Sequence, residues 1–179
     1  MSLDASEVPG KHMDMVNGKQ IVVVRHAIAE AAQADQPDAL RALTVKGKKK
    51  MAKGAQGLKN IFPHADFIAH SPLLRARQTA EILATCYPGV SLHETTVLSP
   101  GKGAAALNAW LRQQQVDRLI LVGHEPGLSR WLSLVLSGRR KAFLELGKAS
   151  ACLVVIPPQA GQARLEWFLT PDLLRALRK

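Results

Sequence analysis

The sequence contains few aromatic side chains and no long hydrophobic run. Only 4% of the 179 residues are aromatic, which disfavours a protein that stacks single-stranded nucleic-acid bases on aromatic rings. The longest unbroken apolar stretch is Ala151–Ile156, with six residues, whereas a transmembrane helix needs about 20. The first fifteen residues contain no apolar core of the kind that a secretory signal requires. We therefore expect a cytoplasmic protein without a membrane span.

Cysteine is also scarce. Cys86 and Cys152 are the two cysteines of the chain, and their wide separation does not match the spacing of metal ligands. A disulfide between them remains open at this stage, but two distant cysteines do not make a disulfide framework. A reducing compartment is the default expectation.

Acidic residues are outnumbered, with 14 Asp and Glu against 24 Lys and Arg, which gives a formal net charge of +10. Residues 1–38 carry three basic and six acidic side chains, whereas residues 39–179 carry 21 basic and eight acidic ones. The positive charge therefore belongs to the body of the protein. It fits either a protein that binds nucleic acid or a membrane surface, or an enzyme with an anionic substrate.

Hydrophobic periodicity predicts a single α/β domain. Residues 1–18 are polar and aperiodic, and we expect them to form a flexible extension to a domain over 19–179. Short apolar runs predict strands and amphipathic stretches predict helices, in alternation. The strands are expected at 21–24, 67–69, 92–98, 119–122, 151–156 and 164–169, and the helices at 44–60, 71–85, 104–115, 126–136 and from 171 onward. This order predicts a three-layer α/β/α sandwich with a mainly parallel central sheet.

Charged and polar residues follow three of the predicted strands. Arg25 and His26 come directly after the first strand, His124 follows the strand at 119–122, and Arg75 lies shortly after the strand at 67–69. Because ligands of open α/β sheets bind outside the carboxyl ends of the strands, these side chains are expected to meet there.

Such a set of side chains favours a phosphate site. Arginine is always cationic, and its planar fork matches the geometry of phosphate. A neutral histidine beside it can act as a nucleophile toward phosphorus, while the arginines neutralise the transferring group. A metal site at His26 and His124 is the competing interpretation, but nearby carboxylates are missing and two fixed cations would lie beside the ion. We expect no metal and no cofactor.

Three motifs resemble those of the histidine phosphatase superfamily, which includes the phosphoglycerate mutases. Residues 24–27 read VRHA and resemble its Arg-His-Gly/Ala signature. Residues 71–80 read SPLLRARQTA and resemble its second motif, S-x-x-x-R-A-x-Q-T-A. Residues 123–126 read GHEP and resemble its G-H-x-P element. The short chain, the stretch DALRALTVKG at 38–47 and the stretch WFLTP at 167–171 are similar to SixA-like phosphohistidine phosphatases. The resemblance implies a phosphoglycerate mutase-like fold.

The resemblance also implies roles for individual residues. His26 would be the nucleophile that becomes phosphorylated, Arg25 and Arg75 would hold the phosphate, and His124 would hydrogen-bond the phosphoryl oxygens. Arg41 matches a position that could add a phosphate contact. The family pattern selects Arg75 rather than Arg77, and two residues along a helix differ by about 200° in direction.

A general acid is not evident in the sequence. An ester leaving group usually needs one, and related enzymes that act on phosphomonoesters carry it between the second motif and the G-H element. Here that interval contains only Glu81, Glu94 and Asp117. Glu94 is the one reasonable candidate, and Glu125 is a second candidate that we interpret mainly as a rim or substrate contact. SixA-like members manage without a dedicated acid, which favours phosphohistidine, because its P–N bond is labile.

We therefore expect a cofactor-independent phosphatase that acts through a phosphohistidine intermediate, with a phosphorylated protein as partner. A small phosphomonoester or anhydride is the second substrate class. A phosphate- or RNA-binding module without turnover is the third alternative, and the intact nucleophile disfavours both this alternative and nucleic acid as a partner.

Overall fold

The computed structural model describes residues 18–139 and 141–178. The predicted flexible extension falls almost entirely on residues 1–17, which lie outside the described residues. Within the described chain, six strands form one sheet: β1 (Lys19–Arg25), β2 (Phe67–His70), β3 (Ser91–Glu94), β4 (Arg118–Gly123), β5 (Ala151–Ile156) and β6 (Arg164–Leu169). The helices there are α1 (Val45–Ile61), α2 (Leu74–Ala84), α3 (Ala104–Arg112), α4 (Gly127–Ser137) and α5 (Pro171–Ala176), with short 3-10 turns η1 (Asp38–Leu40) and η2 (Thr96–Leu98).

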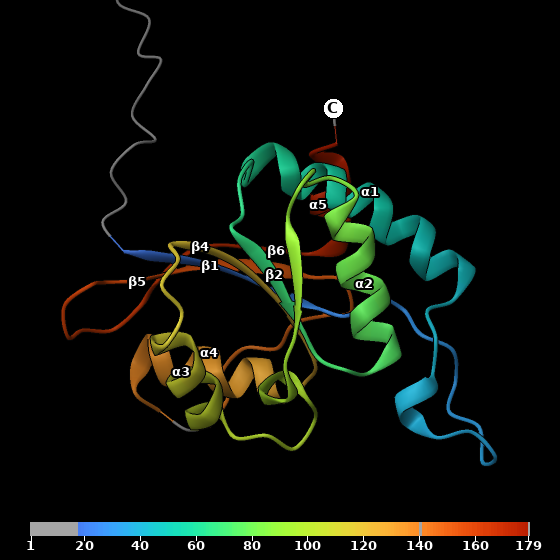
Figure 1. Cartoon of the computed structure of the whole chain (residues 1–179), viewed down its shortest axis with the longest axis horizontal. Coiled ribbons are helices and arrows are strands. Elements are labelled where there is room, and N and C mark those ends of the chain that lie inside the picture. The colour runs from blue at the N-terminus through green and yellow to red at the C-terminus, as the bar shows by residue number, and fades with distance from the viewer. Residues whose placement is uncertain (1–17, 140, 179) are drawn as a thin grey trace, which may run out of the picture.

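The sheet has the strand order β3-β2-β4-β1-β5-β6. The first four strands in this order run parallel to one another, whereas β5 is antiparallel to β1 and β6 is antiparallel to β5. Helices α1, α2 and α5 cover one face of the sheet, and α3 and α4 cover the other (Figure 1). The predicted three-layer α/β/α sandwich with a mainly parallel sheet is confirmed.

The alternation of side chains along the central strands explains why both faces need a cover. Val22 and Val24 of β1 pack into the core under α1 and α2, whereas Ile21 and Val23 pack into the core under α3 and α4. All four are fully buried. Successive strand residues point to opposite faces, so a β-branched run without polar residues suits a strand that is buried on both sides.

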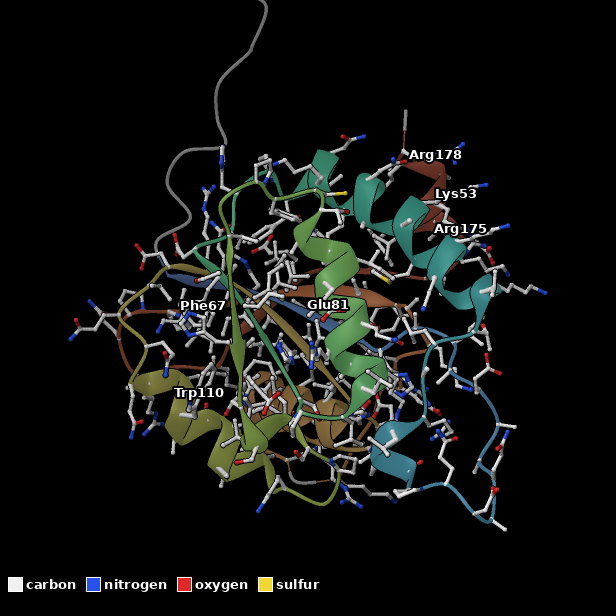
Figure 2. All side chains as sticks on the ribbon, turned by 45° about the vertical axis from the view of Figure 1, so that its right-hand side comes forward. Lys53, Phe67, Glu81, Trp110, Arg175 and Arg178 are labelled. Carbon is white, nitrogen blue, oxygen red and sulfur yellow. The ribbon has the colours of Figure 1, made fainter. Side chains whose placement is uncertain are left out.

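Three glycines of α1, which count against a helix by propensity, are buried where the helix meets its neighbours. A Cβ on Gly47 would lie 2.1 Å from the carbonyl oxygen of Ile28, and one on Gly57 would lie 1.8 Å from that of Leu174. Glycine therefore allows α1 to approach the connection after β1 and the helix α5. Four of the six lysines of α1 are exposed, and one of these, Lys53, lies on the same outer side as Arg175 and Arg178 (Figure 2).

Several helices and strands begin or end at other residues than the sequence predicts. The strand expected over 92–98 divides into β3 and the turn η2, and the helix expected to reach 115 ends at Arg112. The helix expected over 44–60 is α1, and Thr44 caps its start by accepting a hydrogen bond from the Gly47 backbone N–H. The helix expected from residue 71 begins at Leu74 instead, so Ser71 lies before α2, and its hydroxyl contacts His124.

Two further features bear on the sequence predictions. Both cysteines are free thiols, so the disulfide left open by the sequence is not formed. A search of the described residues finds no helix with the length and apolar character that crossing a membrane would need.

A candidate phosphate site

The carboxyl ends of β1 and β4 place the two candidate histidines side by side. Arg25 pairs with Gly123 in the parallel register of these strands, and the His26 backbone N–H donates to the Gly123 carbonyl at 3.1 Å. His26 directly follows β1 and His124 directly follows β4, and the ring centroids of the two histidines lie 5.0 Å apart. Ser71 joins them from β2, since its backbone N–H donates to the Val122 carbonyl at 3.1 Å.

The ring of His26 is held in one tautomer. Its Nδ1 lies 2.8 Å from the carbonyl oxygen of Ala27, and because a carbonyl can only accept, Nδ1 carries the hydrogen. Nε2 of the neutral ring therefore has the free lone pair that a nucleophile needs. Burial lowers the pKa of His26 to about 4, and the positive charges of Arg75, Arg25 and Lys148 act in the same direction. The ring is accordingly neutral at physiological pH.

His124 is held by the hydroxyl of Ser71. Its Nε2 lies 2.9 Å from Ser71 Oγ, and when this hydroxyl donates, Nδ1 of His124 carries the ring hydrogen. That Nδ1 is buried and has no hydrogen-bond partner among the described residues. Burial lowers the pKa of His124 to about 3, with further contributions from His26 and Arg75.

The two candidate phosphate-binding arginines are each held at one end of the guanidinium group. Arg25 Nη1 donates to the Leu146 carbonyl at 2.7 Å. Arg75 donates from Nη1 to the backbone carbonyl of Asp38 at 2.8 Å and from Nη2 to its Oδ2 at 2.9 Å. In both arginines the Nε atom is buried and makes no hydrogen bond within the described chain.

Unpartnered buried donors thus gather around His26. Buried polar groups in proteins are nearly always hydrogen-bonded, so each exception calls for a physical reason. Of four such side-chain atoms in the described residues, three belong to Arg25, Arg75 and His124. An oxyanion, such as the oxygens of a phosphoryl group, is the kind of partner that accepts hydrogen bonds from nitrogen donors of this kind.

Two further residues of the second motif fix the helix that carries Arg75. Thr79 Oγ1 accepts from the Ala27 backbone N–H at 3.1 Å and donates to the Arg75 carbonyl at 2.7 Å. Gln78 Oε1 accepts from the Leu43 backbone N–H at 2.7 Å. Neither residue was predicted to have a role, although both lie in the motif SPLLRARQTA. Arg77 points elsewhere, with its Nε 2.8 Å from Glu81 Oε1.

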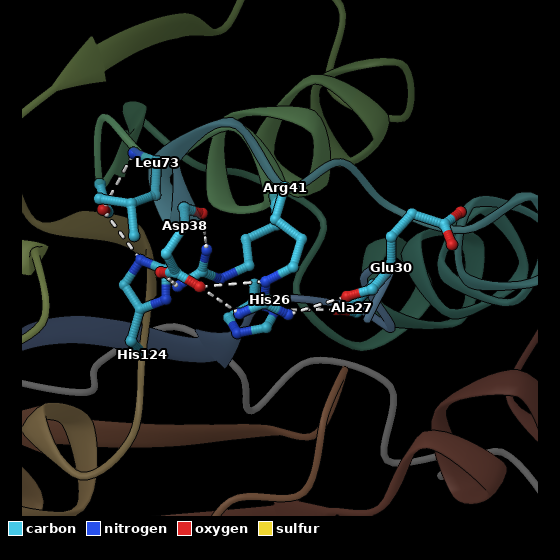
Figure 3. Close-up of polar contacts among 9 residues, drawn as sticks. His26, Ala27, Glu30, Asp38, Arg41, Leu73 and His124 are labelled. Carbon is cyan, nitrogen blue, oxygen red and sulfur yellow. Dashed lines mark hydrogen bonds and ion pairs between the residues drawn. The ribbon is translucent and has the colours of Figure 1, made fainter. Parts of the chain in front are cut away.

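Arg41 approaches the site through Asp38, a residue that the sequence analysis did not single out. Asp38 Oδ1 accepts from Arg41 Nε at 3.0 Å and from Nη2 at 2.7 Å. Figure 3 shows this network beside His26 and His124. The hydrogen bond from Arg41, followed by that from Arg75, holds the pKa of the Asp38 carboxyl below its usual value. Asp38 opens the quoted stretch at 38–47, and this position was the signal that could have identified it.

The two candidate acids lie in different surroundings. Glu94 is the exposed last residue of β3 and pairs in register with His70, so it lies at the carboxyl edge of the sheet. The Glu125 carboxylate accepts from Ser129 Oγ at 2.7 Å and from the Leu146 backbone N–H at 3.1 Å. These contacts tie the start of α4 to the segment that also holds Arg25.

In the described part of the chain, neither a metal site nor the large groove of the molecule coincides with the candidate residues. The described residues contain no group of three or more His, Cys, Asp or Glu side chains arranged to hold a metal ion. A groove of about 960 Å³ lies at the opposite end of the sheet, between the start of β1, the ends of α3 and α4, and the β5–β6 turn. None of the candidate residues named above lines it.

Comparisons with known proteins agree with the motifs. A family model described as "Histidine phosphatase superfamily (branch 1)" matches residues 21–98, which include VRHA and SPLLRARQTA. An uncharacterized protein of Picosynechococcus sp. (strain ATCC 27264 / PCC 7002 / PR-6) is 35% identical over 150 residues, covering 82% of this chain and 88% of the relative. The fold and these matches define a member of the histidine phosphatase superfamily, and the chain belongs to it.

Two solved structures show which known folds this chain resembles. The protein histidine phosphatase SixA in complex with tungstate superposes with a TM-score of 0.76 at 22% identity, covering 86% of this chain and 97% of that one. Phosphoglycerate mutase from Plasmodium falciparum superposes with a TM-score of 0.64 at 21% identity, covering 85% of this chain and 91% of that one. The expected phosphoglycerate mutase-like fold is confirmed, and the chain resembles SixA in its fold.

The two buried histidines predict a dependence of stability on pH. Their pKa values fall from 6.5 in the unfolded chain to about 4 and about 3 in the folded one, so the unfolded chain binds more protons as the pH drops below 6.5. Stability from these groups is complete above pH 6.5 and is lost as the pH falls toward 4. Each histidine contributes about 1.4 kcal/mol per pH unit below 6.5, so we expect urea unfolding to show a free energy roughly 5 kcal/mol smaller at pH 4.5 than at pH 7.5.

A variant with both histidines replaced by Asn provides the control for this prediction. Its free energy of unfolding should change much less between the two pH values. An equal change in the variant and in the wild type would show that other groups cause the pH dependence.

Proposed function

We propose that the chain is a phosphatase that transfers a phosphoryl group to His26 and then to water, with protein phosphohistidine as its substrate. The observation that carries this proposal is the set of unpartnered buried nitrogen atoms of Arg25, Arg75 and His124 around a neutral histidine. These groups match the three peripheral oxygens of a phosphoryl group. The superfamily membership and the SixA-like fold support the same activity.

The proposed reaction has two steps. Nε2 of His26 attacks phosphorus in line, so that a P–Nε2 bond forms while the substrate P–N bond breaks. The substrate imidazole, already protonated on its other ring nitrogen, leaves as neutral imidazole, and the ring of phospho-His26, which keeps its Nδ1 hydrogen, takes the positive charge. The two arginines and His124 hold the phosphoryl oxygens throughout. Water then attacks the phosphorus of phospho-His26, which releases phosphate and restores the free histidine.

The surroundings of the acidic residues support phosphohistidine over an ester. The leaving group of phosphohistidine is an imidazole, and its second ring nitrogen can be protonated before the phosphoryl group is transferred. This reaction therefore needs no general acid from the enzyme. Both oxygens of Glu125 lie near groups of Ser129 or Leu146, and this leaves the carboxylate engaged in structural contacts. Glu94, at the carboxyl edge of β3, is the residue that would serve an ester substrate.

A comparison of substrates tests this proposal. We expect hydrolysis of a phosphohistidine-bearing protein with a kcat/KM at least about 10²-fold higher than for any of a panel of sugar phosphates, nucleotides and phosphoserine. Glu94→Gln should leave phosphohistidine hydrolysis unchanged, as should Glu81→Gln, a matched exposed acid on α2. A preference for a metabolite together with loss of its hydrolysis in Glu94→Gln would establish the ester alternative. Salt-sensitive RNA binding without any turnover would establish the binding module.

A further inference from the structure

Asp38 connects two arginines of the candidate site from the connection between β1 and α1. Its carboxylate accepts from Arg75 through Oδ2 and from Arg41 through Oδ1. The Asp38 side chain is 56% exposed, whereas that of Arg75 is only 5% exposed. The carboxylate thus reaches inward from the rim to a nearly buried cation, and its position is visible in Figure 3.

The contacts to Arg75 use only one edge of its guanidinium group. Nη1 donates to the backbone carbonyl of Asp38 and Nη2 to its carboxylate, so one residue holds the terminal edge at two points. The side edge consists of Nε–H and the second hydrogen of Nη2, which are parallel and can bind an oxyanion in bidentate fashion. Nε is the atom that is buried without a partner in the described structure.

We propose that Asp38 is a positioning residue, which holds the terminal edge of Arg75 so that the side edge binds the phosphoryl group beside His26. The inference rests on the proposed function, because it assigns Asp38 a task in the same phosphate site. The negative charge of Asp38 also allows the guanidinium groups of Arg75 and Arg41 to lie close together, since Arg75 contacts Oδ2 and Arg41 contacts Oδ1 of the same carboxylate.

In a competing interpretation, the Asp38 carboxylate occupies the anion-binding position on Arg75, and phosphate must displace it to bind. The geometry favours positioning, because the backbone carbonyl holds Arg75 as well and would keep the terminal edge occupied after the carboxylate had moved away. The two interpretations predict opposite effects on anion binding. Removing a positioning residue weakens phosphate binding, whereas removing a competitor strengthens it.

The test compares Asp38→Ala and Asp38→Asn with the wild-type chain. Calorimetric titration with inorganic phosphate measures anion binding without requiring turnover, and hydrolysis of the phosphohistidine protein gives kcat and KM. We expect phosphate affinity to fall about 10-fold and kcat to fall about 10- to 100-fold in Asp38→Ala. Asp38→Asn, which keeps an acceptor oxygen, should lose less. Asp35→Ala, a matched exposed acid in the same connection, should leave both unchanged.

A double-variant cycle separates positioning from a general effect on folding. If Asp38 acts through Arg75, adding Asp38→Ala to Arg75→Ala should cause no further loss of phosphate affinity. Additive losses, unchanged phosphate binding in Asp38→Ala, or tighter phosphate binding in either variant would each overturn the proposal. A wild-type chain that binds phosphate but hydrolyses nothing would refute the proposed function alone, and the phosphate titrations would still decide the role of Asp38.

Discussion

Replacing His26 by Ala is expected to lower phosphohistidine hydrolysis by about 10⁴-fold or more, because no phosphoryl acceptor remains. Wild-type protein quenched during turnover of ³²P-labelled substrate should carry an acid-labile, base-stable label, as phosphohistidine does. The label should be absent from His26→Ala. Kinetics and trapping together therefore distinguish a nucleophile from a residue that only binds substrate.

Two controls belong with this variant. His64 is an exposed histidine on the connection between α1 and β2, and His64→Ala should retain wild-type activity and labelling. Circular dichroism of His26→Ala should match that of the wild type, because within residues 18–139 and 141–178 neutral His26 makes its side-chain hydrogen bond only to the adjacent Ala27 carbonyl. Undiminished hydrolysis by the folded His26→Ala protein would refute the covalent mechanism.

The second large effect is expected from Arg75→Ala. This variant removes a nearly buried guanidinium group from the site and leaves the transferring phosphoryl group less neutralised. Loss of one such charge-stabilising group costs about 10²- to 10³-fold in rate. We expect a decrease of this size in kcat/KM, together with weaker binding of inorganic phosphate measured by calorimetry.

Arg77→Ala is the matched control, because the same helix carries it two residues later. Its side chain is 59% exposed and pairs with Glu81, whereas that of Arg75 is 5% exposed and pairs with Asp38. An exposed ion pair of this kind contributes little to stability, so Arg77→Ala should keep activity and phosphate binding. Equal losses in the two variants would argue against a phosphate contact at Arg75.

The architecture could be predicted because the strands carry a strong local signal. The β-branched run of β1 and the apolar run of β4 both end where polar motif residues begin, and the parallel register then places His26 beside His124. The edge strand β3 was predicted less well. All four of its residues are exposed, so its sequence lacks the alternation or the long apolar run that burial imposes.

The supporting contacts of the site could not be predicted from spacing. Ser71 was expected within a helix over 71–85 and instead contacts His124, because the backbone between Ser71 and Leu74 is not helical. Asp38 meets Arg75 across 37 positions of sequence, a pairing that only the tertiary fold creates. Lys148 acts on the pKa of His26 from the segment before β5, and no pattern in the sequence connects the two.

The connection from Ala27 to Leu43 is fastened at both ends to α2, by Thr79 and by Gln78. Residues 30–40 between these two points are exposed. Insertions or deletions confined to residues 31–36 should therefore leave His26, Arg25 and Arg75 in place, since surface loops change length at little energetic cost. Residues 31–36 are thus the part of this connection that can differ in length while the candidate site residues on either side of it keep their positions.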